Sequence, residues 1–93
     1  MNKEQSTKCL RILMHYRADK QKLKCCEELT ELLSAILWQI NKGNHVAAII
    51  DEMADVYIML EQLKYMLPGV EMNLGKKIDE KLDRQLKRIQ SGE

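Results

Sequence analysis

The chain has 93 residues, a length that supports one small domain with a thin hydrophobic core. Its 15 basic and 14 acidic residues leave a formal net charge of +1 without a block of like charges, so the composition argues against nucleic acid as a partner. The polar N-terminus lacks the apolar segment of a signal peptide, and no apolar run is long enough to span a bilayer. We therefore expect a cytoplasmic protein that has no membrane partner.

The three cysteines, Cys9, Cys25 and Cys26, support the same location. Their number is odd, two are adjacent, and no C-x-x-C spacing is present, which indicates reduced thiols rather than a disulfide framework. The two histidines, His15 and His45, have no ligand spacing to these thiols, so a zinc site is not expected.

Hydrophobic periodicity predicts helices throughout and no strand. The first helix covers about residues 3–16, and its boundary with the second lies near residues 17–21, where no glycine or proline marks the break. The second helix, about residues 23–40, carries apolar residues at the i, i+3, i+4, i+7 spacing of an amphipathic helix. These residues are Leu29, Leu32, Leu33, Ile36, Leu37 and Ile40.

Two breaks separate the remaining helices. The segment NKGNH at residues 41–45 ends the second helix, and Asn44 is the expected N-cap of the third. Pro68 and Gly69 form the turn that leads into a charged fourth helix at about residues 72–89.

The third helix, residues 46–67, is apolar around nearly its whole circumference, which is typical of a helix buried on most sides. A chain this short has too few helices to cover such a surface by itself. We therefore expect an all-α fold in which residues 1–93 form one four-helix domain and the helical bundle is shared between the subunits of a homodimer or homotetramer.

The acidic residues of the second and third helices form two groups. Glu28 and Glu31 lie three residues apart and so share a face of the second helix, and Glu52 and Asp55 repeat this spacing in the third. Carboxylates this close repel one another, and a carboxylate in apolar surroundings needs a partner. If the two helices are antiparallel, the four side chains converge and a divalent cation would offset their repulsion.

Ligands that are all carboxylate oxygens suit Mg²⁺, with Mn²⁺ as the alternative, rather than zinc or copper. A di-iron bundle would need Glu-x-x-His pairs, and neither acidic group has a histidine at that offset. The competing interpretation is a solvated acidic helix face that binds no ion.

The sequence Glu28-x-x-Glu31 followed by Glu52-x-x-Asp55 resembles the E-x-x-E…E-x-x-D pattern of MazG-like nucleoside triphosphate pyrophosphohydrolases. Glu27 supplies the doubled glutamate often seen at the start of that pattern. The resemblance covers about residues 23–89.

Three cationic residues extend the resemblance. Lys24 stands three residues before the doubled glutamate, where such proteins commonly have a lysine. The sequence DEKLDRQLKRI is similar to the N-x-K-x-x-R element of the family and contributes Lys81 and Arg84. Asp79 occupies the asparagine position of that element, which leaves the role of this residue open.

The resemblance implies a Mg²⁺-dependent enzyme that hydrolyses (deoxy)nucleoside triphosphates to monophosphate and pyrophosphate, as in the clearing of nucleotide pools. It implies four metal ligands, Glu28, Glu31, Glu52 and Asp55. It also implies that Glu27 is a catalytic base that orients water, or an additional ligand. A simple acid on the helix surface is the alternative for this residue.

The resemblance further implies that Lys24, Lys81 and Arg84 bind the triphosphate and offset its charge. For Lys24 the alternative is a simple ion pair with Glu28. Trp38 projects near Glu31 rather than with the leucine stripe, so a nucleotide base could stack on it. Packing between subunits explains the tryptophan equally well.

Two other functions remain alternatives. Phosphoribosyl-ATP pyrophosphatase has a similar size and acidic pattern, but the histidine expected soon after its second acidic motif is missing from DVYIML here. The other alternative is a non-catalytic helical interaction module, against which the presence of all four metal-type acids argues.

Overall fold

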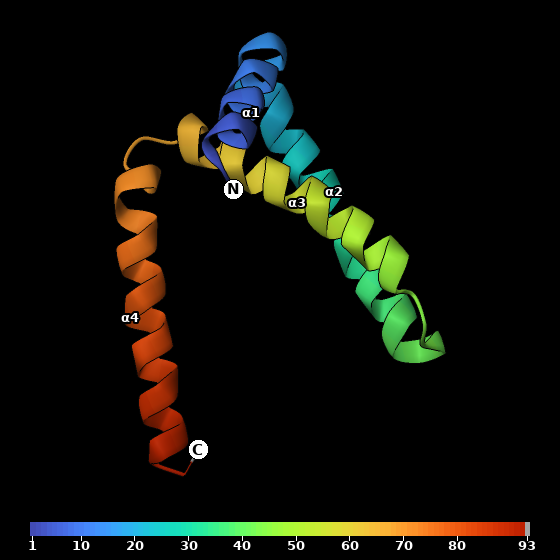
Figure 1. The fold of residues 1–93 in the computed structure, drawn as a ribbon, viewed down its shortest axis with the longest axis vertical. Helices are drawn as coiled ribbons and strands as arrows, with labels where there is room; N and C mark the ends of the chain where they lie inside the picture. The colour runs from blue at the N-terminus through green and yellow to red at the C-terminus, as the bar shows by residue number, and fades with distance from the viewer. Residues whose placement is uncertain (93) are drawn as a thin grey trace.

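The computed structural model describes residues 1–92, which fold into four α-helices with no strand. The helices are α1 (Lys3–Tyr16), α2 (Ala18–Lys42), α3 (Val46–Met66) and α4 (Val70–Gln90), as Figure 1 shows. This confirms the all-α fold predicted from the periodicity, although α2 begins earlier than predicted. Within the described residues, no helix combines the length and the apolar character needed to cross a membrane.

The first helix starts from a capping box and ends at one strained residue. The Asn2 side chain accepts a hydrogen bond from the Gln5 backbone N–H at 2.8 Å, and the Gln5 side chain accepts one from the Asn2 backbone N–H at 3.0 Å. Arg17 alone separates α1 from α2, with φ 74° and ψ 161°. This backbone region is essentially reserved for glycine, so the change of direction between α1 and α2 imposes local strain on an arginine.

The loop between α2 and α3 reverses the chain through two residues with positive φ. Gly43 has φ 71° and Asn44 has φ 53°, a conformation that glycine and asparagine tolerate better than other residues. The N-cap of α3 is His45, which makes no side-chain capping bond. The prediction that Asn44 caps the third helix is therefore wrong, because this asparagine forms the turn that precedes the cap.

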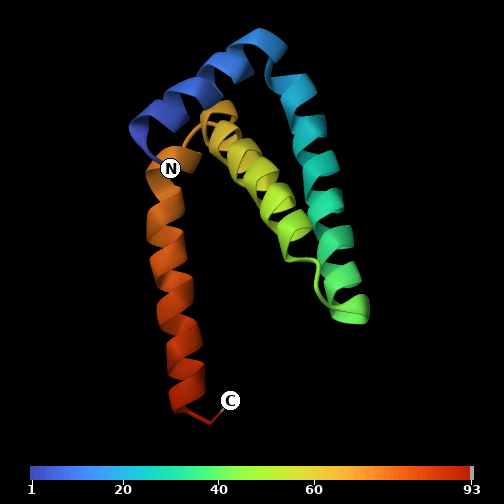
Figure 2. The same ribbon diagram turned by 45° about the vertical axis from the view of Figure 1, so that its right-hand side comes forward.

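Helices α2 and α3 form an antiparallel pair, and α1 packs against both (Figures 1 and 2). Three of the buried side chains between these helices, Gln21, Glu28 and Gln62, are polar, although glutamate and glutamine are mostly found exposed. The seam between α2 and α3 is therefore partly polar. The buried apolar residues are Cys9, Leu13, Cys25, Ala35, Val56 and Met59.

The apolar stripe of α2 faces away from this seam. Leu33 is 57% exposed and Ile40 is 68% exposed. In the single chain, α1 and α2 leave one face of α3 uncovered, which agrees with the expectation that a chain this short cannot cover an apolar helix by itself. Burial of that face in an assembly stays a prediction. The exposed residues of that face are Val46, Ile50, Met53, Tyr57 and Leu60.

Helix α4 leaves the other three after the turn at Pro68 and Gly69 and runs apart from α2 in both views (Figures 1 and 2). In the described part of the chain it packs against α3 alone and buries none of its own residues. The radius of gyration is 16.1 Å, whereas a compact domain of this length would have about 12 Å. The accessible surface is 7630 Å², against roughly 5600 Å² for a compact monomer of this mass.

Candidate metal centre

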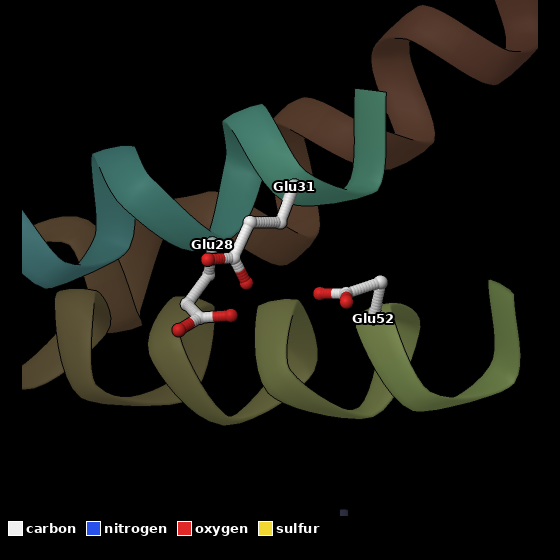
Figure 3. A group of neighbouring side chains, drawn as sticks. All are labelled: Glu28, Glu31 and Glu52. Atoms are coloured by element: carbon white, nitrogen blue, oxygen red, sulfur yellow. The ribbon is translucent and has the colours of Figure 1, made fainter. Parts of the chain in front are cut away.

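Three carboxylates from two helices meet at the α2–α3 seam. Glu28 and Glu31 are one helical turn apart on α2, and Glu52 lies opposite them on α3. One carboxylate oxygen of each residue lies within 4.8 Å of one from each of the others. Figure 3 shows the three side chains directed toward a common space between the helices. The antiparallel pairing of α2 and α3 thus converts two separate sequence spacings into one acidic cluster.

Two oxygens of this cluster are buried without a partner. The Glu28 side chain is 8% exposed, and its Oε1 forms an ion pair with Lys24 Nζ at 3.1 Å. Its Oε2 and the Oε2 of Glu52 are shielded from solvent and have no hydrogen-bond partner among the described residues. Buried polar atoms are almost always paired with protein, water or an ion. The oxygens therefore fit a site that receives a cation.

Asp55 adjoins the cluster but does not belong to the group of three. It lies one turn beyond Glu52 on α3, and its side chain is exposed. Partial loss of solvent raises the pKa of the Asp55 carboxyl, and the negative charges of Glu28 and Asp51 raise it further. The positive charge of Lys24 lowers the pKa of Asp55 but does not offset these effects.

Lys24 and Glu27 form the solvent side of the site. The Lys24 ammonium pairs with Glu28 at 3.1 Å and with Glu27 at 3.4 Å, and these contacts raise the pKa of Lys24, Glu28 contributing most. The Glu27 side chain is 63% exposed. Glu27 therefore reaches the cluster only through the lysine that it shares with Glu28.

Trp38 lies two turns beyond Glu31 on the same side of α2, about 10 Å away along the helix axis. Its indole is exposed and contacts the His45 imidazole, with 5.5 Å between ring centroids. The structure thus places this tryptophan at the loop end of the α2–α3 pair. The histidine contact was not evident from the sequence, because it depends on how the loop folds back.

Lys81 and Arg84 are not brought to the carboxylates within one chain. Both are exposed on α4, which within the described residues packs only against α3 near the Pro68 turn. The spacing along α4 is as predicted, but spacing does not determine where a helix docks. Their assignment as substrate-binding residues stays a prediction.

A buried pair of amides in the same seam was not predicted from the sequence. Gln21 Nε2 donates a hydrogen bond to Gln62 Oε1 at 2.8 Å, which joins α2 to α3. The sequence indicates this pair only through spacing. Gln21, Cys25 and Glu28 follow one another at four and three residues, so they share one face of α2. Hydrophobicity does not reveal a face that is partly polar.

A second missed residue is Glu61, which ties α1 to α3. It accepts hydrogen bonds from Ser6 Oγ at 3.4 Å and from Tyr65 Oη at 3.1 Å, and it pairs with Lys64 at 2.8 Å. Lys64 is the main reason that the pKa of Glu61 is lowered. This network has a structural role, because its partners already satisfy the carboxylate.

Comparison with protein-family models, curated proteins and solved structures finds no match to this chain.

Proposed function

We propose that this protein is a Mg²⁺-dependent nucleoside triphosphate pyrophosphohydrolase that cleaves the α–β phosphoanhydride bond. The observation that carries the proposal is the convergence of Glu28, Glu31 and Glu52 with two buried, unpartnered oxygens among them. The resemblance of the acidic pattern to MazG-like enzymes supports the same reaction. Conversion of a triphosphate to a monophosphate and pyrophosphate is the chemistry implied.

The donor set determines which ion fits. Glu28, Glu31 and Glu52 offer only carboxylate oxygens, a set that suits Mg²⁺ or Mn²⁺. Asp55, with its raised pKa, stands where a cation would favour the ionised carboxylate and complete the ligand set. When bound, such an ion would supply charge neutralisation at the phosphate oxygens and lower the pKa of a bound water.

The residues around the cluster have roles that follow from their positions. Lys24 would pair with a phosphate oxygen from its half-exposed place beside Glu28 and so hold the substrate at the cluster. Glu27, exposed and one residue away from the ligand Glu28, would accept a proton from the attacking water. Both roles require that the substrate approach from the solvent side of α2.

Assembly is part of the proposal. The chain exposes roughly 2000 Å² more surface than a compact monomer of its mass, and much of the exposed area of α2 and α3 is apolar. Such an excess is the size of surface that stable interfaces bury. We therefore propose a homodimer or homotetramer in which a second copy covers the stripes of α2 and α3. The same packing would fix α4 and bring Lys81 and Arg84 to bound phosphate.

The reaction is tested by incubating the protein with Mg²⁺ and a panel of ribo- and deoxyribonucleoside triphosphates, with product separation by chromatography. Monophosphate and pyrophosphate are the expected products, and excess EDTA is the control. Diphosphate and orthophosphate would contradict the proposed bond. The absence of product from every nucleotide, including phosphoribosyl-ATP, would overturn the enzyme assignment in favour of a helical interaction module.

A further inference from the structure

The Gln21–Gln62 pair is the most deeply buried polar feature of the described chain. Gln62 is 0% exposed and Gln21 is 6% exposed. Gln62 accepts the Gln21 amide N–H through its Oε1, while its own Nε2 has no hydrogen-bond partner among the described residues. A donor left unpaired in the interior is unfavourable, and a methionine or leucine of similar size would avoid that loss. The unpaired donor therefore needs an explanation beyond packing.

A pocket opens beside this pair. Its volume is about 620 Å³, within the range of sites that hold small organic molecules. Ile12 of α1 and Met59 of α3 give it apolar walls, and Tyr16 adds an aromatic side chain. Gln21 and Gln62 supply the polar groups. Apolar walls with a few convergent polar groups are typical of a site for an organic ring rather than for an ion.

Lys24 connects the pocket to the acidic cluster, although Glu28, Glu31 and Glu52 do not line the pocket themselves. Lys24 and Glu27 line it as well, and Lys24 also pairs with Glu28 of the cluster. Gln21 precedes Glu28 by seven residues, which corresponds to about 10 Å along the axis of α2. This separation matches the length of a nucleoside from its 5′ oxygen to the far edge of its base. A substrate whose phosphates lie at the carboxylates can therefore place its base beside the glutamines.

We propose that this pocket between α1, α2 and α3 binds the nucleotide base and that Gln21 and Gln62 read its hydrogen-bonding edge. The inference rests on the proposed function. Gln62 Nε2 provides an unpaired donor, and Gln21 keeps its carbonyl oxygen as an acceptor, since that residue uses its amide nitrogen in the pair. The edge recognised is one that presents an acceptor next to a donor, as the pairing edges of nucleobases do.

The test compares a nucleotide with a ligand that has phosphates but no base. Binding of an α,β-methylene nucleoside triphosphate and of inorganic tripolyphosphate is measured by calorimetry in Mg²⁺, for the wild type and for Gln62→Met. The variant keeps the size of the side chain but removes both the unpaired donor and the oxygen that accepts the Gln21 hydrogen bond, so circular dichroism and thermal unfolding check that it folds. The expected result is about tenfold weaker nucleotide binding, the loss of one hydrogen bond, with unchanged tripolyphosphate binding.

Glu28→Gln is the matched control, because it should weaken the binding of both ligands. Unchanged nucleotide affinity in Gln62→Met would overturn the base pocket, and so would an equal loss for both ligands. In either case, if the wild type turns over nucleotides, the proposed reaction stands without this pocket. If the wild type binds neither ligand in Mg²⁺, the proposed function fails and the base pocket fails with it.

Discussion

The adjacent residues Glu27 and Glu28 allow a sharp test of the metal centre. Both pair with Lys24, but the Glu28 side chain is 8% exposed while that of Glu27 is 63% exposed. We predict that Glu28→Gln makes the metal-free protein more stable and abolishes its response to Mg²⁺. Glu27→Gln should change neither property, because this side chain contacts the cluster only through the lysine.

The size of the effect follows from the two oxygens of Glu28. Replacing this buried carboxylate by a neutral amide removes a charge that has an unpartnered Oε2 and is repelled by Glu31 and Glu52, and should recover roughly 1–3 kcal/mol. Loss of the ion pair with the half-exposed Lys24 costs about 0–1 kcal/mol. The difference is a net gain of about 0–3 kcal/mol, and its midpoint of about 1.5 kcal/mol corresponds to a rise in melting temperature of roughly 6–12 °C for a domain of this length. For Glu27→Gln, an exposed substitution, we expect a change within about 0.5 kcal/mol.

The assay is thermal unfolding at one fixed protein concentration, first in EDTA and then across a Mg²⁺ titration. Wild type and Glu27→Gln should gain stability that grows with the logarithm of Mg²⁺ above Kd, about 2.7 kcal/mol at one hundred times Kd. Glu28→Gln should show the higher melting temperature in EDTA and no further gain. A lower melting temperature in EDTA, or a Mg²⁺ response equal to that of the wild type, would refute the reasoning.

Three further predictions concern other parts of the molecule. Because the pKa of Asp55 is raised, its contribution to stability is present below the ordinary aspartate pKa of 3.8 and is lost as the pH rises through the folded-state value. In EDTA, Asp55→Asn should therefore flatten the decline in melting temperature above that pH, and an unchanged decline would contradict the assignment. Leu33→Glu, in the exposed stripe of α2, should reduce the molar mass measured by light scattering to that of a monomer. Met14→Glu, at an exposed position of α1, is the control and should leave the mass unchanged. An unchanged mass for Leu33→Glu would show that the stripe is not part of the interface. Arg17→Gly should raise the melting temperature by about 4–8 °C by relieving roughly 1 kcal/mol of backbone strain. Arg17→Ala is the control without this relief, and equal melting temperatures for the two variants would show that the strain is absent.

The helices could be predicted from the sequence where a residue type signals their ends. Gly43 and the Pro68–Gly69 pair mark the two loops, and both loops lie where predicted. The end of α1 carries no such mark, because Arg17 adopts a conformation that its residue type disfavours. The end of α1 is therefore set by the packing of α1 on α3 and not by the conformational preference of the residue at that point.

The candidate site could be predicted only in part. The spacing of Glu28 and Glu31 sets them on one face, and an antiparallel α3 brings Glu52 to them. The seam itself could not be predicted, because the strongest hydrophobic signal in α2 belongs to a face that the single chain leaves exposed. Gln21 and Gln62 therefore could not be predicted from the hydrophobic pattern, although their hydrogen bond joins α2 to α3.

The connectivity of the helices has a consequence for the time course of folding. The principal packing joins α2 to α3, which are consecutive and linked by a short loop, so this hairpin closes through contacts that are near in sequence. Chains dominated by such local contacts fold in microseconds to milliseconds. Meeting a second chain is a bimolecular event whose rate falls with dilution. In the proposed assembly, the apolar stripes of a newly synthesised chain therefore form early and stay exposed until a second chain covers them. The time for which the stripes stay exposed, and can bind other apolar surfaces, therefore lengthens as the concentration of the protein falls.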